Sequence, residues 1–371
     1  MFDSKRRKVL IIASEFPPDA GGIGNHAFNL ALHLAKENFS VTVLADIVHA
    51  SKQEIENSDW VRKINFVPVY RKRIVLATYY SRVQKAITLS KRSDVIFLSG
   101  KFPVWLTALL RMLRPSKKII AIVHGTELPE RFINFNLKKC DRIVAVSNFT
   151  LSLIPSFIKK TVKSCVIPNG VDVGEFADAL IPQHRKHDQE NLQLITVGSV
   201  TERKGQRNVI NALPTIVRRF PQVCYHMVGQ PVLKKELNEL IVEKKLNAHI
   251  RFHGAISRKE LIQLLADADI KLMLSTNTSS RDVEGFGIAI LEANALGIPA
   301  IGSKNTGIED AIRNNETGIL VDPKNAIEVS QAIEKVLCDY EFFSGNAKQW
   351  AMQHDWKILI HRYMEIIESV F

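Results

Sequence analysis

The sequence predicts an α/β fold of two parallel-sheet domains, and three observations lead to this prediction. The chain has 371 residues, of which 46% are apolar and 24% charged, and this is enough to bury two sizeable cores. Short β-branched runs alternate with longer segments of helical periodicity, as in parallel sheets covered by helices on both faces. The alternation lapses once, over residues 175–191, which we therefore expect to be an interdomain linker.

The expected elements follow this alternation along the chain. In the first half, a glycine-rich turn opens a helix over residues 21–36, and strands are predicted at 9–13, 41–44, 95–98, 119–123 and 143–146. In the second half, strands are predicted at 192–197, 223–228, 250–252, 270–274, 299–301 and 318–321. Residues 350–371 are predicted to be helical, with bulky side chains at helical spacing. Each half is therefore expected to form a Rossmann-like domain.

Cysteine usage and hydropathy restrict the class of protein. The four cysteines are scattered and form no CxxC pair, which argues against a zinc site or a disulfide framework. The apolar run 9–13 is too short for the core of a signal peptide, and the richest apolar stretch, 104–110, is too short to cross a bilayer. We therefore expect a cytoplasmic protein, or one that lies at the inner face of the cell membrane.

Positive charge is concentrated in the first half. Residues 1–180 hold 27 Lys and Arg against 15 Asp and Glu, whereas residues 181–371 hold 23 of each. The densest part, 71–92, interleaves basic residues with Tyr79 and Tyr80, which suggests an anionic membrane surface as a candidate partner. A merely solvated basic surface is the alternative. Nucleic acid is not expected, because no RNP-like or recognition-helix pattern accompanies the charge.

In open α/β sheets ligands bind beyond the carboxyl ends of the strands, and several motifs fall there. In the first half, Gly22 and Gly24 loosely match a dinucleotide fingerprint. The preceding connection, 14–20, is too long for that fingerprint, so a flexible loop closing over a ligand is favoured. His124 directly follows the strand 119–123 and can hydrogen-bond a polar ligand.

The second half places cations after its first strand. Gly198 ends this strand, and Arg203 and Lys204 follow within a short loop. Arg binds two phosphate oxygens at once and Lys acts as a mobile point charge, so the pair suits a diphosphate. A pair of cations that only caps a helix is the alternative.

The segment 284–292, EGFGIAILE, is the most informative motif of the chain. Gly285 and Gly287 let the backbone approach a ligand closely, and the start of the following helix favours an anion. Glu292 lies eight residues after Glu284, a little over two helical turns, and therefore near the same face. The alternative is that Glu284 caps the helix while Glu292 is solvated. Loops at 293–302, 306–310 and 316–321 are expected on the same sheet edge.

Together these motifs resemble the retaining glycosyltransferases of family 4, which have the GT-B fold. The matching segments span nearly the whole chain in family order: GGIGNH (21–26), HGTE (124–127), VIPNGVD (166–172), V…RKG (197–205), the pair Glu284 and Glu292, and ETG (316–318). The resemblance implies two Rossmann-like domains facing a central cleft. The acceptor would be bound by residues 1–180, with a crossing helix at about 352–371, and the nucleotide-sugar donor by residues 190–351.

The resemblance also implies a role for each site residue. Arg203, Lys204 and backbone N–H groups near Phe286, Gly287 and Ile288 would neutralise the diphosphate, and Gly22 would lie in the loop that folds over it. Glu292 would accept hydrogen bonds from the ribose, and Gly198 and the backbone from Gly254 to Ile256 would also meet the donor. Glu284 would contact the transferred sugar, and His124 would approach it from the acceptor domain.

The implied reaction is transfer of a sugar, with retention, from a UDP- or GDP-sugar to a hydroxyl of a glycan or lipid-linked acceptor in cell-surface polysaccharide or lipopolysaccharide synthesis. No cofactor or metal is expected. Two departures from the family pattern are Ser199, where many relatives have arginine, and the segment TGIED at 306–310, where they have Gly-Gly-x-Pro-Glu. The alternatives are a sugar phosphorylase or nucleotide-sugar epimerase on the same fold, a nicotinamide-dependent dehydrogenase, and a non-catalytic nucleotide- or glycan-binding subunit.

Overall fold

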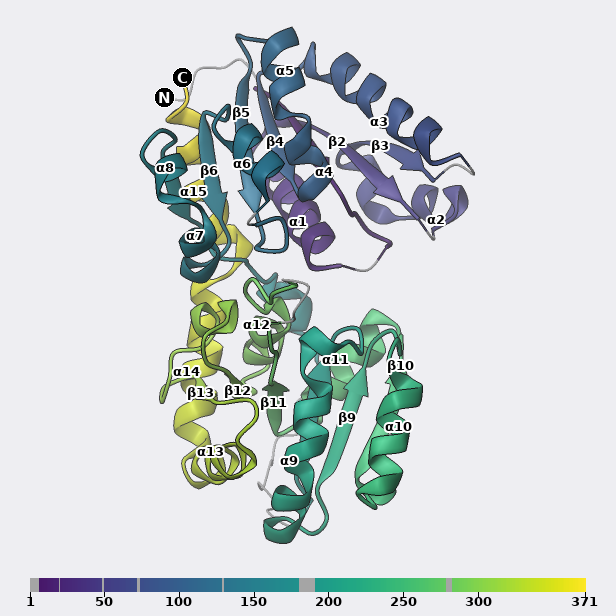
Figure 1. Ribbon diagram of the computed structural model, residues 1–371, viewed down its shortest axis with the longest axis vertical. Coiled ribbons are helices and arrows are strands. Elements are labelled where there is room, and N and C mark those ends of the chain that lie inside the picture. The colour runs from purple at the N-terminus through teal and green to yellow at the C-terminus, as the bar shows by residue number, and fades with distance from the viewer. Residues whose placement is uncertain are drawn as a thin grey trace. The chain divides into compact units, whose positions relative to one another are not determined.

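The computed structural model describes residues 7–19, 21–48, 50–71, 74–128, 130–179, 191–277 and 282–371 (Figure 1). The chain divides into two compact units, of which the first comprises Met1–Asn169 and Trp356–Phe371 and the second Gly170–Asp355. The second unit begins ahead of the stretch 175–191 expected as a linker, most of which lies outside the described residues.

The first unit is built on a parallel sheet of seven strands in the order β3-β2-β1-β4-β5-β6-β7. Their bounds are β1 Lys8–Ala13, β2 Ser40–Ile47, β3 Asn65–Tyr70, β4 Val95–Ser99, β5 Lys118–Val123, β6 Arg142–Ala145 and β7 Ser164–Val166. Five of these match the predicted runs, and β3 and β7 are additional. The sequence pattern did not predict β3 because Pro68 lies within it, and proline cannot donate a hydrogen bond to a β-ladder. β3 is an edge strand, where proline is tolerated.

Helices cover both faces of the first sheet, as the apolar strands require. On one face α1 packs against α15, which belongs to the far end of the chain, and on the other α3 to α6 enclose a core that includes Leu10, Ile96 and Leu98. The helices of this unit are α1 Gly22–Lys36, α2 Lys52–Glu56, α3 Val75–Ser90, α4 Lys101–Trp105, α5 Thr107–Leu113, α6 Arg131–Leu137, α7 Asn148–Leu153, α8 Ser156–Lys159 and α15 Trp356–Glu368.

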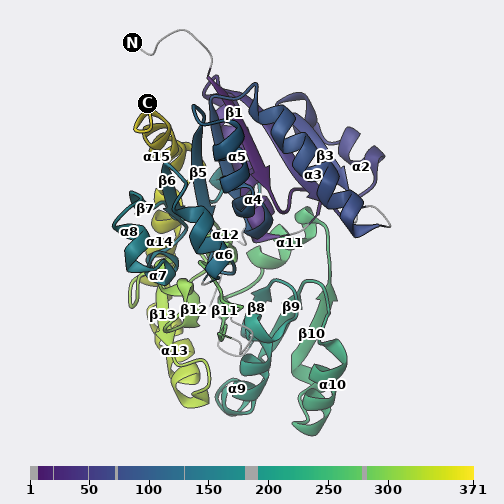
Figure 2. The same cartoon turned by 45° about the horizontal axis from the view of Figure 1, so that its top comes forward.

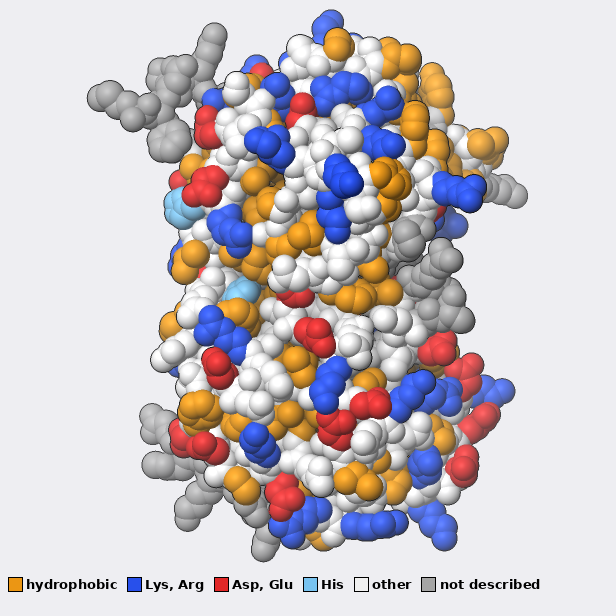
Figure 3. Space-filling model, turned by 60° about the vertical axis from the view of Figure 1, so that its left-hand side comes forward, with side chains coloured by type: hydrophobic (Ala, Val, Ile, Leu, Met, Phe, Trp, Pro, Cys, Tyr) orange, Lys and Arg blue, Asp and Glu red, His pale blue; other side chains and the backbone are white. Residues whose placement is uncertain are grey.

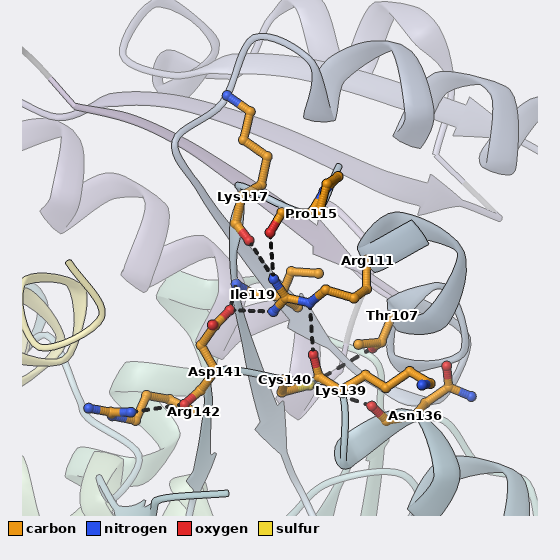
Figure 4. A network of polar contacts seen from close by, with 10 residues as sticks. All are labelled: Thr107, Arg111, Pro115, Lys117, Ile119, Asn136, Lys139, Cys140, Asp141 and Arg142. Atoms are coloured by element: carbon orange, nitrogen blue, oxygen red, sulfur yellow. Dashed lines mark hydrogen bonds and ion pairs between the residues drawn. The ribbon is translucent and has the colours of Figure 1, made fainter. Parts of the chain in front are cut away.

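A polar network anchors α5 at the amino end of β6 (Figure 4). Arg111 Nη2 lies 2.5 Å from Asp141 Oδ2, which also accepts a hydrogen bond from the backbone N–H of Ile119 at 2.7 Å. Arg111 Nη1 further donates to the carbonyls of Pro115 and Lys117. This network lies at the sheet edge opposite to the carboxyl ends of the strands, so it stabilises the fold away from any ligand.

The second unit has a parallel sheet of six strands in the order β10-β9-β8-β11-β12-β13, seen in Figure 2. Their bounds are β8 Gln193–Val197, β9 Cys224–Val228, β10 Ile250–Gly254, β11 Ile270–Met273, β12 Ala300–Ser303 and β13 Gly318–Val321, all within a residue or two of the predicted runs. The predicted α/β fold with two parallel sheets is confirmed.

The helices of the second unit also lie on both faces of its sheet. α9 packs with α10 and α13 over one core, and α12 packs with α14 over the other face. Their bounds are α9 Gln206–Arg219, α10 Lys234–Glu243, α11 Arg258–Ala266, α12 Ile288–Ala295, α13 Ala326–Cys338 and α14 Tyr340–Gln353.

The helix predicted over residues 350–371 is instead two helices, α14 and α15. They are separated at His354, whose carbonyl accepts a hydrogen bond from the backbone N–H of Val171 at 3.0 Å. A carbonyl used in this way is not available to a continuing helix. Helical periodicity alone could not show this break, because the partner residue is distant in the sequence.

Each sheet has one point where the strand order reverses direction. It lies between β1 and β4 in the first sheet and between β8 and β11 in the second. The loops that follow these four strands diverge at the carboxyl edge, which is where open α/β sheets bind ligands.

Candidate active site

The loops after β8 and β11 bring three predicted site residues of the second unit together. Arg203 and Lys204 lie in the 3₁₀ turn η3, Glu202–Lys204, after β8, and Glu284 lies in the connection after β11. Lys204 Nζ is 2.8 Å from Glu284 Oε2, and Arg203 Nη1 donates to the same oxygen. Arg203 Nε donates to Asp282 at 3.0 Å. The cation pair therefore does not cap a helix; it forms an ion cluster at the switch point of the sheet.

Burial and the two cations set the charge of Glu284. The residue is 8% exposed, and this burial by itself raises the pKa of the carboxyl group. Lys204 and Arg203 act in the opposite direction, and together they hold the pKa below its usual value. Glu284 is therefore ionised at neutral pH. It does not cap α12, because Gly287 is the N-cap.

Glycines shape the backbone on both sides of this cluster. Gly198 has a φ of +136°, and a Cβ there would lie 3.2 Å from Lys204 Cε, so the lysine stem packs directly over this glycine. Gly287 has a φ of +93° and begins α12 without a capping side chain, so the amide of Ile288 opens the first turn. Phe286 is 1% exposed, so its ring packs in the core and does not line an open surface.

Glu292 occupies a second, adjoining cluster on α12. It is 7% exposed, and its Oε1 accepts a hydrogen bond from Arg258 Nη1 at 2.7 Å, so it is not a solvated surface acid. Arg258 also binds both carboxylate oxygens of Glu175 at 2.7 Å. Since Arg258 begins α11, it links Glu292 to the loop that contains Gly254 and Ile256. The sequence argument missed Arg258 and Glu175, which carry no local motif.

Lys271 lies in the centre of β11 and is another residue that the motifs did not identify. It is 0% exposed, and its Nζ has no hydrogen-bond partner among the described residues. Burial lowers the pKa of this amine to about 7, while Glu292 raises it and Lys204 lowers it. A charged residue inside the apolar run 270–274 was the signal that could have identified it.

The loop 306–310 lies against the Glu284 segment, as expected. The N–H of Gly307 donates to the carbonyl of Glu284 at 2.9 Å, and a Cβ on Gly307 would lie 2.2 Å from the Gly285 carbonyl carbon. The expectation for 293–302 is wrong, because this stretch holds the end of α12, the connection that precedes β12 at the amino edge of the sheet, and most of β12. The expectation for 316–321 is also wrong. Thr317 directly precedes β13, at the amino edge of a parallel sheet, so this segment cannot line a pocket with Glu284.

In the first unit, His124 lies at the carboxyl end of β5. Its Nε2 is 2.9 Å from Ser99 Oγ, at the end of β4, and its backbone N–H donates to Glu127 Oε2 at 3.0 Å. Burial lowers the pKa of His124 to about 3 and raises that of Glu127 to about 7. His124 is therefore neutral at pH 7 and acts as a hydrogen-bonding group, not a charge.

A second histidine, His26 on α1, packs against His124. It belongs to the segment GGIGNH, but the sequence analysis gave it no role. The two rings meet edge to face with centroids 5.2 Å apart. His26 Nε2 is 2.8 Å from Tyr363 Oη on α15, so the last helix contributes to the surroundings of His124. Burial, and then His124, lower the pKa of His26 well below its usual value.

Gly22 begins α1, but the space for a side chain is smaller at the neighbouring Gly21 and Gly24. A Cβ on Gly22 would meet nothing within 4 Å, whereas on Gly21 it would lie 1.8 Å from Glu15 Oε2. A Cβ on Gly24 would lie 3.0 Å from the backbone nitrogen of Phe16. The overlap at position 21 is with the end of a flexible side chain, which can move, whereas the contact at position 24 is with backbone. Close packing therefore favours glycine at position 24 and leaves open space at position 22.

No group of three or more His, Cys, Asp or Glu among the described residues could hold a metal ion. In the same part of the chain, no helix is long and apolar enough to cross a membrane.

Solved structures with the same architecture define the fold class. Anabaena HepE in complex with UDP and glucose superposes with a TM-score of 0.77 at 20% identity, covering 98% of this chain and 100% of that one. Sucrose-phosphate synthase from Thermosynechococcus elongatus superposes with a TM-score of 0.79 at 18% identity, covering 99% of both chains. The fold is that of the GT-B glycosyltransferases.

Sequence comparison then gives the family. Residues 20–175 match the model of "Glycosyltransferase Family 4", and residues 177–350 match that of "Glycosyl transferases group 1". The two models together place the chain among the family 4, group 1 glycosyltransferases, and the protein is a glycosyltransferase. A GDP-mannose-dependent α-(1-6)-phosphatidylinositol monomannoside mannosyltransferase of Mycobacterium tuberculosis is 26% identical over 90% of this chain and 89% of the relative. A GDP-mannose-dependent monoacylated α-(1-6)-phosphatidylinositol monomannoside mannosyltransferase of Corynebacterium glutamicum is 25% identical over 99% of this chain and 99% of the relative.

Proposed function

We propose that this enzyme transfers a sugar from a nucleotide-diphosphate sugar to a hydroxyl group of a glycan or lipid-linked acceptor, with retention at the anomeric carbon. The single observation that carries the proposal is the cluster of Arg203, Lys204 and Glu284 at the switch point of the second sheet. Two cations and one buried carboxylate suit a diphosphate next to a hydroxyl-rich ring. The donor is thus assigned to the second unit, and the acceptor to the first.

The donor is proposed to lie along α12. Its diphosphate takes Arg203, Lys204 and the amides of Phe286, Gly287 and Ile288, which releases Glu284 to accept hydrogen bonds from the sugar. Glu292 accepts from the ribose hydroxyls. The backbone from Gly254 to Ile256 meets the base, and what supports this is that Arg258 joins Glu292 to the same loop. Gly198 admits the donor beside the Lys204 stem.

The proposed donor is UDP- or GDP-linked, and GDP-mannose is the first candidate. Its support is that the relatives from Mycobacterium tuberculosis and Corynebacterium glutamicum, which span nearly the full chain, are named GDP-mannose-dependent. The complexes of HepE with UDP and glucose keep a UDP-sugar as the second candidate.

In the proposed reaction, the oxygen of the acceptor hydroxyl bonds to the anomeric carbon as the bond between that carbon and the diphosphate oxygen breaks, and the hydroxyl proton passes to the leaving diphosphate. The negative charge that develops on the leaving diphosphate is stabilised by Arg203, Lys204 and backbone N–H groups, with no metal required. His124, neutral at pH 7 because of its burial, donates or accepts a hydrogen bond to the reacting sugar and does not act as a charged acid. Gly22 contributes through the loop that closes over the phosphates.

The proposed acceptor is presented at an anionic membrane surface. In support, the charged side chains on the face of the first unit shown in Figure 3 are mainly Lys and Arg, whereas Asp and Glu are mixed with them on the second unit. At the start of α3, Ile74 is 66% exposed, Leu76 79% and Tyr80 68%, an apolar group beside Arg71. Arg82 and Lys85 do not add to this surface, because they bind Asp46 and the Pro68 carbonyl.

Liposome flotation tests the membrane assignment. Binding to vesicles that contain anionic lipid should exceed binding to neutral vesicles, and it should fall at high salt and in Leu76→Glu. Equal partitioning with both kinds of vesicle contradicts it.

The donor assignment is tested by thermal shift with GDP-mannose, UDP-glucose, ADP-glucose and dTDP-glucose. A donor at a hundred times its dissociation constant stabilises by about 2.7 kcal/mol, enough to rank the bases. Arg203→Ala and Lys204→Ala should each lose this shift and turnover, and each should lower the melting temperature of the free protein only modestly, because Glu284 keeps its other cation. Wild-type rates in both variants would contradict the proposed clamp.

The reaction class is tested by product analysis. Proton NMR of the product from an α-linked donor should show an α-linkage, and a β-linkage would contradict retention. Turnover that needs no acceptor would indicate an epimerase, and strict dependence on inorganic phosphate would indicate a phosphorylase. Donor binding with no turnover on any acceptor would indicate a binding subunit.

A further inference from the structure

The first unit contains a cavity that none of the predicted site residues lines. It has a volume of about 180 Å³ and lies beyond the carboxyl ends of β2 and β3, under the first turns of α3. Asp46, Arg71, Val75, Thr78, Tyr79 and Arg82 line it. Its place at the carboxyl edge of a parallel sheet is where α/β folds bind ligands.

A fixed ion pair forms the polar wall of the cavity. Arg82 Nε lies 2.6 Å from Asp46 Oδ1, and their side chains are 18% and 13% exposed. The guanidinium also lies over the rings of Tyr79 and Phe102, 5.0 Å from each centroid, which holds it in place. Burial raises the pKa of Asp46 to about 6, although Arg82 opposes the shift, so this carboxylate is incompletely solvated and favours further hydrogen-bond donors.

The lining restricts the chemistry of the ligand. A hydroxyl group both donates and accepts, so two adjacent hydroxyls on a ring can donate to Asp46 and accept from Arg82 at the same time. Val75 and Tyr79 give the apolar wall on which the C–H face of such a ring can pack. A free anion would meet the carboxylate of Asp46, and an apolar ligand would leave the ion pair desolvated without new partners.

We propose that this cavity binds a hydroxyl-bearing six-membered ring, a sugar or cyclitol, as an acceptor subsite. This rests on the proposed function for the assignment of the acceptor to the first unit. β2 is two strands from β4 and three from β5 in the sheet. Strands are about 4.8 Å apart, so the cavity lies roughly 10–15 Å from Ser99 and His124 along the sheet edge. A ring in the cavity is therefore not the one that receives the sugar but another unit of the same acceptor.

One structural link couples the cavity to the glycine-rich turn. The backbone N–H groups of Val48 and Ala50 donate to the two carboxylate oxygens of Asp19, at 2.6 and 3.2 Å. Val48 lines the cavity, and Asp19 ends the described part of the loop between β1 and α1. Because a ring in the cavity would be a second unit of the acceptor, the enzyme is expected to prefer acceptors of two or more rings over single rings.

Saturation-transfer NMR of the full chain tests the subsite with methyl α-D-mannopyranoside and myo-inositol as ring probes. The wild type should give signals from the ring C–H protons at millimolar concentrations. Asp46→Asn should weaken binding about ten-fold, the loss expected when a hydrogen bond to a charged group is removed. Tyr79→Leu, which keeps the ion pair, should weaken it by less. The absence of ring signals in the wild type overturns the proposal.

The matched control is Asp141→Asn. Its ion pair with Arg111 is of the same kind and the same unit, but it lies at the opposite edge of the sheet (Figure 4). Ring binding should survive in this variant, and equal loss in both variants would overturn the proposal as a general effect on folding. Inorganic phosphate, followed by ³¹P line width, is the anion probe. Phosphate binding that excludes the ring probes and persists in Asp46→Asn identifies an anion site and overturns the ring assignment.

Donor binding separates this proposal from the proposed function. Thermal shift with GDP-mannose should be the same in the wild type, Asp46→Asn and Asp141→Asn, because the donor is assigned to the second unit. If no nucleotide sugar shifts any of the three proteins while the ring probes still bind through Asp46, the proposed function fails and the ring subsite stands.

Discussion

Glu284 is a side chain whose charge is determined by its surroundings in the second unit. It is almost fully buried, yet it stays ionised because Lys204 and Arg203 contact the same oxygen. A carboxylate in this position stabilises the ligand-free protein and, in the proposed function, exchanges the cations for hydroxyl groups when the diphosphate binds. The same contact thus serves stability before binding and recognition after it.

Replacing Glu284 with Gln should lower the stability of the second unit at pH 7 by about 1–3 kcal/mol, because the half-buried Lys204 loses this carboxylate and Arg203 keeps only Asp282. The folded pKa of Glu284 lies below its unfolded value, so its contribution is present above the unfolded pKa and is lost as the pH falls through the folded one. Calorimetry of both proteins over the acid range should show their melting temperatures converging. A constant difference at all pH values would contradict this.

Lys271 is the opposite case, a buried amine that finds no hydrogen-bond partner in the described part of the chain. Lys271→Met should stabilise the second unit by about 1–4 kcal/mol at pH 7, because no charge then has to be desolvated. The folded pKa, about 7, lies below the unfolded value of 10.5, so the unfolded chain binds more protons between them and wild-type stability rises over this window. Calorimetric scans should show this rise in the wild type and not in the variant. Parallel pH profiles would be inconsistent with the buried amine.

Loops and helices position the site through close backbone contacts. The 3₁₀ turn η5, Gly307–Asp310, lies directly against Gly285, and a side chain at position 307 would overlap its carbonyl. The segment that presents Glu284 is therefore supported by the loop after β12. The need for glycine at position 307 therefore arises from the contact between the two loops, and neither loop shows it alone.

Gly307→Ala should separate these loops and abolish the donor-induced thermal shift, at a cost of about 1–3 kcal/mol in stability from overpacking. Gly345→Ala, in α14 of the same unit, is the matched control. A Cβ there meets nothing within 4 Å, and alanine favours a helix over glycine by about 1 kcal/mol, so this variant should bind donor normally and melt slightly higher. Normal donor binding by Gly307→Ala would show that the contact is not needed.

At the scale of the whole molecule, the first unit is completed by the end of the chain. α15 packs on α1, and Trp356 and Tyr363 are 1% and 0% exposed there. Tyr363 also binds His26, which contacts His124. Residues more than two hundred positions apart thus share one core, so the first unit cannot be complete until the second has been synthesised.

Trp356→Ala should destabilise the first unit by about 3–5 kcal/mol, the usual loss for a buried tryptophan. The second unit, Gly170–Asp355, has its own core and should keep its stability. Hydrogen exchange should therefore quicken in β4 and β5 and stay unchanged in β8 and β11. Equal acceleration in both units would contradict their independence.

The sequence by itself determined the elements and the family. Apolar runs predicted eleven of the strands, because a strand buried on both faces must be apolar along its length. Motifs at strand ends predicted Arg203, Lys204, Glu284 and His124 as site residues, since the carboxyl edge of a parallel sheet brings such ends together. Helical spacing from Glu284 added Glu292 to this prediction. Charge counting placed the basic excess in the first half.

Only the tertiary structure decided which of these residues contact one another and which unpredicted residues join them. Arg258 binds both Glu292 and Glu175, Tyr363 on the last helix binds His26, and Asp46 binds Arg82 beside a cavity. The segment 316–318 proved to lie at the wrong edge because it precedes its strand. Local patterns record periodicity and turn chemistry, but contacts between distant positions depend on how the sheets and their covering helices pack, which no short window of sequence contains.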